Sequence, residues 1–311
     1  MEISDMIDPL PELSTEQSDP RYSQIDRLPT ERIARLMNQA DAAVPAAVAV
    51  VIPAISAAID AIADRMAAGG RLFYVGAGTS GRLAVLDASE CPPTFGTDPS
   101  LVQGVIAGGP DALTRSVEGA EDDAEAGAAA LKDLEVGPLD SVVGVSASGR
   151  APFVLGALAE AASAGALTVG LSCNDDAPLS AAAEHAIEVV VGPEVVTGST
   201  RLKAGTAQKL VLNMISTISM VKLGRTYGKH DDRDVGHEQQ ARGAGHAHRR
   251  RHHRRRPRDR GSGAGRGRWP GEGRRADDPA RPRRRRRPRA AGVARRAPER
   301  RAERLRRATG Q

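Results

Sequence analysis

Short runs of Val, Ile and Leu recur along the first two thirds of the chain, and alanine-rich segments with helical spacing separate them. Alternation of apolar strands with helices is typical of a parallel sheet that is covered on both faces. The pattern therefore predicts an α/β fold, an open three-layer α/β/α sandwich with a central parallel sheet. We expect its strands at residues 71–76, 101–108, 141–148, 166–173 and 186–192.

Helical segments are expected before and between these strands. Thr30 follows Pro29 as a candidate cap, and the pair Gly69-Gly70 is a typical helix stop. Residues 44–68 are apolar on more than one face, as in a helix that is covered on several sides in a subunit interface. The expected helices span residues 30–40, 44–68, 119–131, 153–164 and 204–223, the last with Leu210, Met214, Ile218 and Val221 on one face.

The chain changes character near residue 228. Residues 1–228 carry 15 Lys and Arg against 29 Asp and Glu, a net charge of −14, whereas residues 229–311 carry 29 against 10, a net charge of +19. The second part has almost no Ile, Leu, Val or Phe, so it cannot bury enough apolar surface to offset its chain entropy. We predict a disordered, Arg-rich tail over residues 229–311.

Three interpretations of this tail are open: a nucleic-acid or membrane-binding segment, a solvated terminus without function, and the product of a shifted reading frame. Codon arithmetic favours the third. Read from the second base of each codon, His230-Asp231-Asp232 can become Met-Met-Ile, and residues 236–241 can become Ala-Thr-Asn-Ser-Lys-Leu. We therefore predict no nucleic-acid partner and no membrane partner from the basicity of the tail.

The remaining composition points to a cytoplasmic protein without a metal. Met1 is followed by acidic residues, and the chain contains no 18-residue apolar span. Cys91 and Cys173 are far apart, with neither CxxC nor Cys/His ligand spacing. Neither a disulfide framework nor a zinc site is predicted.

Two turns of similar composition follow the first and the third predicted strand, "GAGTSG" at 76–81 and "SASGR" at 146–150. Ligands of open α/β sheets bind at the carboxyl ends of the strands, and helix N-termini hold anions there. A GxGxxG string is typical of dinucleotide sites, but the acidic residue expected about 20 residues later is missing in the required setting. Tight turns capped by their own hydroxyls are the alternative. We predict a phosphate site made by Gly78, Thr79, Ser80, Ser146 and Ser148.

Two carboxylates stand in rigid, small-residue surroundings. Glu90 lies in "ASECPPT", where Pro92 and Pro93 are expected to stop a helix, and Glu121 lies in "SVEGAEDD". We expect both beyond the carboxyl edge of the sheet, although a solvated surface charge is the alternative for either. Two carboxyl groups in unequal environments can serve as acid and base.

Five ordered motifs resemble the N-acetylmuramic acid 6-phosphate etherase family, a branch of the sugar isomerase (SIS) domain proteins. The motifs are "GAGTSGRLAVLDASECPPTFG", "VEGAEDD", "SASGRAPFV", "GLSCN" and "EVVTGSTRLKAGTAQKLVLNMISTISM", within a resemblance over about residues 12–228. The resemblance implies a SIS-type domain at 44–228 after an N-terminal segment and helix at 1–43, no cofactor, and a homodimer with its site near the subunit boundary. The family's helical region after Gly228 is replaced here by the Arg-rich sequence, and the shifted frame restores the family's Ala-Thr-Asn-Xaa-Lys-Leu segment.

The resemblance also implies a reaction. The D-lactyl ether of N-acetylmuramic acid 6-phosphate would be cleaved to N-acetylglucosamine 6-phosphate and D-lactate, in the recycling of cell-wall amino sugars. By resemblance, Glu90 protonates the lactyl oxygen and Glu121 belongs to the base step, with Glu118 as its competitor. Thr79, Ser80, Ser146 and Ser148 hold the phosphate, and Arg201 and Lys203 are further candidates for anion binding. The alternatives are a non-catalytic SIS-domain regulator that senses sugar phosphates and an aldose–ketose isomerase.

Overall fold

The computed structural model describes residues 13–227 and 230–231 of the 311-residue chain. Strands β6 (Thr226–Tyr227) and β7 (His230–Asp231) form a short antiparallel pair. The remainder of the predicted Arg-rich tail, from residue 232 on, lies outside the described residues. The domain boundaries expected at residues 43 and 228 stay predictions.

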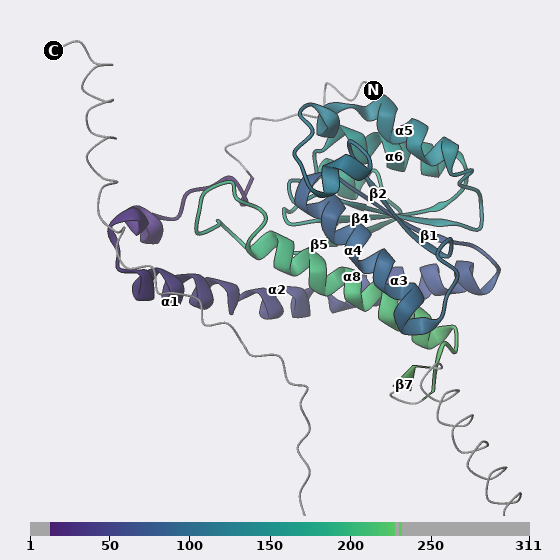
Figure 1. Ribbon diagram of the computed structural model, residues 1–311, viewed down its shortest axis with the longest axis horizontal. Helices are drawn as coiled ribbons and strands as arrows, with labels where there is room; N and C mark the ends of the chain where they lie inside the picture. Colours follow the sequence, from purple (N-terminus) through teal and green to yellow (C-terminus); the bar gives the residue numbers. More distant parts are fainter. Residues whose placement is uncertain (1–12, 228–229, 232–311) are drawn as a thin grey trace, which may run out of the picture. The chain divides into compact units, whose positions relative to one another are not determined.

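A five-stranded parallel sheet lies at the centre of the described chain, as the apolar runs predicted (Figure 1). Its strand order is β2-β1-β3-β4-β5. Strand β2 thus lies on one side of β1, and β3 and the later strands lie on the other side. The carboxyl ends of β1 and β3 therefore flank a topological switch point, where open α/β sheets bind ligands. The strands are β1 (Leu72–Gly76), β2 (Val102–Ile106), β3 (Ser141–Val145), β4 (Leu167–Ser172) and β5 (His185–Glu188).

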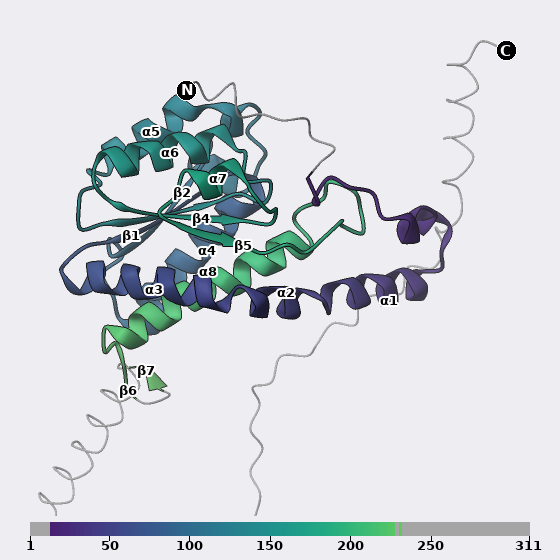
Figure 2. The ribbon, with the colours of Figure 1, turned by 180° about the vertical axis from the view of Figure 1, so that it is seen from behind.

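Helices cover both faces of the sheet, which confirms the three-layer sandwich (Figures 1 and 2). Leu72 and Tyr74 of β1 pack on the side of α3, α4 and α8, whereas Phe73 and Val75 pack on the side of α5 and α6, because successive side chains of a strand point to opposite faces. The helices are α1 (Thr30–Asp41), α2 (Val44–Val50), α3 (Ile52–Ala67), α4 (Gly78–Phe95), α5 (Ala124–Asp133), α6 (Pro152–Ser163), α7 (Pro178–Ala181) and α8 (Lys203–Lys222).

Two helix predictions need correction at prolines. The helix expected over 44–68 is interrupted at Val51, because Pro53 in the first turn of α3 cannot donate to the preceding turn. Conversely, Pro92 and Pro93 do not stop α4, which continues to Phe95 and ends at Gly96 in the left-handed conformation (φ 65°). The prolines lie in the last turn of the helix, and each lacks only its own N–H donor. The Gly96 N–H still bonds to the Pro92 carbonyl, so few backbone hydrogen bonds of the helix are lost.

The buried face of α8 also differs from the expected apolar stripe. Ile218 and Val221 are exposed, whereas the small and polar residues Ala207, Gln208 and Ser216 are buried. Helix α8 packs against α4, where small side chains allow the two helices to approach closely. Leu210 and Met214 of the expected stripe do pack against the core, so apolar periodicity was right for the first half of this face and wrong for Ile218 and Val221.

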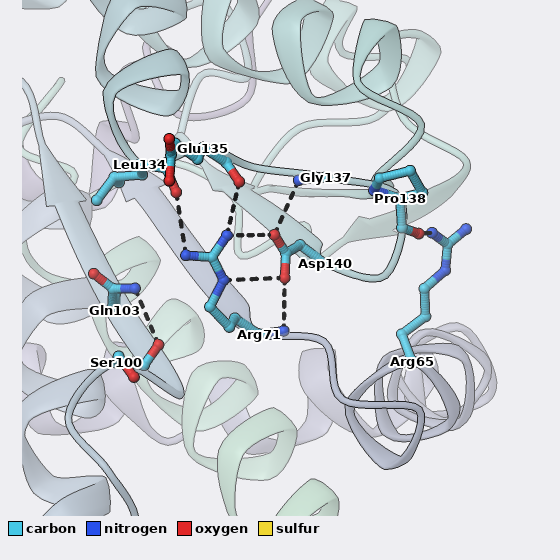
Figure 3. A network of polar contacts seen from close by, with 9 residues as sticks. All are labelled: Arg65, Arg71, Ser100, Gln103, Leu134, Glu135, Gly137, Pro138 and Asp140. Carbon is cyan, nitrogen blue, oxygen red and sulfur yellow. Dashed lines mark hydrogen bonds and ion pairs between the residues drawn. The ribbon is translucent and has the colours of Figure 1, made fainter.

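A polar network fixes the amino edge of the sheet, opposite the switch point (Figure 3). The Arg71 guanidinium donates to both carboxylate oxygens of Asp140, at 3.2 and 2.7 Å, just before β1 and β3 begin. It also donates to the carbonyls of Leu134 and Glu135. This bond pattern joins the starts of two neighbouring strands and the loop after α5.

Candidate functional site

The two predicted hydroxyl turns meet at the switch point and line one hollow. The hollow has a volume of about 300 Å³, and its walls begin where β1 and β3 end. The fold therefore places the residues expected to bind phosphate in one hollow, beside Glu121, which is one of the two expected catalytic carboxylates. The residues lining the hollow that bear on its chemistry are Glu16, Gly78, Thr79, Ser80, Glu121, Ser146, Ser148 and Thr200.

The first turn owes its shape to two glycines in contact. A Cβ at Gly81 would lie 2.6 Å from the Gly76 carbonyl oxygen, and one at Gly76 would lie 2.7 Å from the Gly81 nitrogen. Helix α4 can therefore start directly over the end of β1. Its N-cap, Ala77, offers no side chain to the first N–H groups, which suits them to an anionic ligand.

The second turn presents two hydroxyls in a compact loop. The Ser146 and Ser148 Oγ atoms lie 3.3 Å apart, and they accept bonds from the backbone N–H groups of Gly149 and Arg150, respectively. One of the two hydroxyls donates to the other, so the remaining hydroxyl proton is available for an acceptor in the hollow. The N-cap of the following helix α6 is Ala151, again without a side-chain cap.

Of the two predicted catalytic carboxylates, Glu121 is the one that lines this hollow. It belongs to a 3-10 turn, Ala120–Asp122, and it lines both the main hollow and an adjoining one. Desolvation by its surroundings, and secondly the charge of Asp122, raise the pKa of Glu121. Both Glu118 and Glu121 are exposed in part, but Glu118 does not line either hollow. The geometry therefore favours Glu121 over Glu118 for a contact with a bound ligand.

Glu90 is not where the sequence pattern placed it. It lies on the exposed surface of α4, twelve residues after Gly78, which is roughly 18 Å along the helix axis. Helix α4 runs back from the carboxyl edge of the sheet, so Glu90 is far from that edge and does not line the hollow. The expectation that both carboxylates stand beyond the same edge of one chain is wrong.

Arg82 and Lys203, two basic residues near the site, form hydrogen bonds that stabilise the surrounding fold. Arg82 donates to the carbonyls of Leu113 and Arg115, and so holds the loop that leads to Glu121. Lys203 is buried, and its Nζ donates to the Val191 carbonyl at 2.5 Å, so it does not line the hollow. Arg201 is exposed and likewise does not line it.

Two lining residues were missed by the sequence analysis. Glu16 precedes the first long helix, and Thr200 lies in the segment before α8. Neither has a spacing or composition that marks it, because both are brought in from distant parts of the chain. Only their inclusion in segments quoted for the family resemblance could have singled them out.

Thiol and metal chemistry find no support at the site. Cys91 and Cys173 are buried and unpaired, and burial raises the pKa of each thiol to about 12. Both are therefore neutral thiols at physiological pH. Within residues 13–227 and 230–231, no group of three or more His, Cys, Asp or Glu is arranged to hold a metal ion.

Over the same residues, no single helix is long and apolar enough to cross a membrane. Thr30–Val50 and Ile52–Ala67 reach that length and apolar composition only when taken together, and the chain bends between them.

Several known proteins and one family model are similar to this chain. The family model described as the glucokinase regulatory protein N-terminal SIS domain matches residues 54–162. N-acetylmuramic acid 6-phosphate etherase of Streptomyces avermitilis is 66% identical over 216 residues, which are 70% of this chain and 70% of that protein. The protein of the same name from Rubrobacter xylanophilus is 62% identical over 219 residues, 70% of this chain and 73% of its own. Among solved structures, a phosphoheptose isomerase from Neisseria gonorrhoeae is 17% identical, with a TM-score of 0.48 over 61% of this chain and 98% of its own.

The parallel sheet, its switch point and the pair of hydroxyl turns define a SIS-domain protein of the α/β class. Within that class, the chain belongs to the N-acetylmuramic acid 6-phosphate etherase family.

Proposed function

We propose that this protein cleaves the D-lactyl ether of N-acetylmuramic acid 6-phosphate, giving N-acetylglucosamine 6-phosphate and D-lactate in cell-wall amino-sugar recycling. The single observation that carries the assignment to this site is the meeting of two hydroxyl turns and Glu121 in one hollow. The family membership supplies the substrate.

The chemistry follows from the weakness of an ether as a leaving group. Opening the sugar to its aldehyde makes the C2 proton acidic. A base removes that proton, an acid protonates the lactyl oxygen as the C3–O bond breaks, and water then adds to C3 of the unsaturated aldehyde. This sequence consumes one water and needs no redox partner.

The 6-phosphate is proposed to bind between the two turns. Thr79, Ser80, Ser146 and Ser148 carry hydroxyl donors, and the uncapped N-termini of α4 and α6 add backbone N–H groups and positive partial charge. Helix termini and hydroxyls can hold a phosphate without lysine, which suits a hollow that neither Arg201 nor Lys203 lines.

Glu121 is proposed to be the base that removes the C2 proton. Its raised pKa makes its carboxylate a stronger proton acceptor than that of an ordinary glutamate. Its position between the main hollow and the adjoining one lets it face a sugar whose phosphate sits on the turns.

Glu90 is proposed to act from a second copy of the chain. Its exposed position on α4, outside the hollow of its own chain, is accounted for if a homodimer brings it to the partner's hollow. Leu86, one turn earlier on the same helix face, is 53% exposed and would be covered together with Glu90 in such a dimer. We also propose a cytoplasmic location for the protein, because a phosphorylated substrate and two unpaired cysteines are typical of that compartment.

Release of D-lactate from N-acetylmuramic acid 6-phosphate by the full chain tests the function. Glu90→Gln and Glu121→Gln, each alone, should release little lactate. If Glu90 acts across the interface, mixing the two variants under exchange should restore about a quarter of the parental activity, because half of the sites in half of the dimers are intact. No recovery on mixing, with dimers present, would place both glutamates in one chain's site.

The reading-frame hypothesis for the tail requires its own measurement. Resequencing the gene across codons 225–235 distinguishes a shifted frame from a true Arg-rich tail. If the frame is shifted, the chain with the restored frame should exceed the present chain in lactate release.

A further inference from the structure

A buried amide attaches the N-terminal segment to the phosphate turns. Asn174, which follows β4, is 2% exposed, and its Nδ2 donates to the Ala147 carbonyl at 2.9 Å and to Thr15 Oγ1 at 3.1 Å. Its Oδ1 accepts from Ser14 Oγ at 2.9 Å and from the Thr15 N–H. One side chain therefore binds the loop between Ser146 and Ser148 and also the residue before Glu16.

This attachment fixes Glu16 at the hollow. Thr15 is fully buried, so the backbone that enters Glu16 cannot drift, and the Glu16 side chain lines the same hollow as Glu121. The chain makes room for it at Gly198, where a Cβ would lie 3.0 Å from Glu16 Oε2. Glu16 is thus a second carboxylate in the hollow of a single chain, and the steps assigned to Glu121 and Glu90 do not use it.

The proposed reaction contains one more proton transfer than these two glutamates perform. Before C2 can be deprotonated, the ring must open: the proton leaves the anomeric hydroxyl, the C1–O5 bond breaks, C1 becomes an aldehyde, and O5 gains a proton. A carboxylate that accepts the first proton and returns it to O5 completes this step without net change to itself.

We propose that Glu16 contacts the sugar and transfers the ring-opening proton between the anomeric hydroxyl and O5. This inference rests on the proposed sugar-phosphate site. Glu16 performs its step before the Glu121 step, and it does so on product as well as on substrate, because N-acetylglucosamine 6-phosphate has the same ring.

Exchange between the two anomers of N-acetylglucosamine 6-phosphate, measured by magnetisation-transfer NMR on the full chain, isolates this step from ether cleavage. The parent protein should accelerate the exchange over buffer. Glu16→Gln should reduce the acceleration on the order of 100-fold. Glu125→Gln, on the exposed surface of α5, is the matched control and should behave as the parent.

A structural role is separated by binding. Since Asn174 binds Ser14 and Thr15 rather than the Glu16 carboxylate, Glu16→Gln should keep the Kd for the sugar phosphate within about twofold while its turnover falls. No acceleration by the parent, or full acceleration by Glu16→Gln, overturns the inference. Failure of the parent to release lactate overturns the etherase function instead, and the anomer measurement remains valid in that case.

Discussion

The Ser80 hydroxyl donates a hydrogen bond to Gln208 Oε1, 3.0 Å away, and so joins the first hydroxyl turn to α8. Gln208 is 1% exposed, and its Nε2 makes no hydrogen bond within the described part of the chain. In this arrangement the Ser80 proton points at Gln208. Rotation of the amide by half a turn would let Nε2 donate to Ser80 and release the Ser80 proton to a bound phosphate.

Ser80 and Gln208 should therefore act as a unit in phosphate binding. Ser80→Ala should weaken binding of the phosphorylated sugar by about 1.5–3 kcal/mol, the cost of a hydrogen bond to a charged group. Gln208→Met, which keeps volume but cannot donate, should also weaken it, yet it should add little in the Ser80→Ala background. Calorimetric Kd values of the four proteins test this, with unphosphorylated sugar as control; fully additive losses would contradict it.

The two glutamates proposed as acid and base should differ in deuterium exchange. Glu90→Gln should still exchange the C2 proton of substrate with solvent deuterium while it releases little lactate, because the base remains. Glu121→Gln should lose both, each on the order of 100-fold or more. Normal exchange in Glu121→Gln would move the base role to Glu118, so Glu118→Gln belongs in the same NMR series.

The acidic limb of the pH–rate profile should respond to Asp122. Desolvation and the Asp122 charge both raise the pKa of Glu121, so the protonated, inactive form persists to higher pH than for an ordinary glutamate. Asp122→Asn removes only the charge, and it should move the acidic limb of kcat/KM to lower pH. Asp133→Asn, on the exposed end of α5, is the matched control, and an equal shift there would refute the argument.

Gly81 should tolerate no side chain. A Cβ there would meet the Gly76 carbonyl oxygen and Ile106 Cγ1, both at 2.6 Å, although alanine normally favours a helix interior. Gly81→Ala should destabilise the fold by roughly 1–3 kcal/mol in urea unfolding. Gly137→Ala has open space around its Cβ and should be neutral or stabilising by up to about 1 kcal/mol. Equal effects at the two positions would exclude close packing as the cause.

Asp140 should make stability depend on acid pH. Burial alone would raise its pKa, but hydrogen bonds from the Arg71 side chain and from backbone N–H groups outweigh burial and hold the pKa below its ordinary value. The resulting stabilisation is present above the unfolded-state pKa and is lost as pH falls through the folded-state pKa. Asp140→Asn should therefore differ most from the parent at pH 7 in urea unfolding, and the difference should shrink as pH falls below about 4 towards the folded-state pKa. A difference that is constant with pH would contradict the assignment.

The local pattern of the chain determined its layers. Five short apolar runs became five parallel strands, and β1, β3 and β4 are buried throughout, because a strand covered on both faces must be apolar on both. The two hydroxyl turns could likewise be located, since small residues between a strand and a helix are a local signal. Their meeting followed from general rules for parallel sheets, and the strand order β2-β1-β3 then placed them side by side.

Only the tertiary structure decided which side chains share the hollow. The position of Glu90 depends on the direction in which α4 runs from the carboxyl edge of the sheet, which no local pattern of the sequence reports. Glu16 is held at the site because its neighbours Ser14 and Thr15 bind Asn174, and Gln208 bonds to Ser80. These contacts span 128 to 160 residues and leave no periodic trace. Periodicity reports what each segment buries, whereas the site is formed by contacts between segments that are distant in sequence.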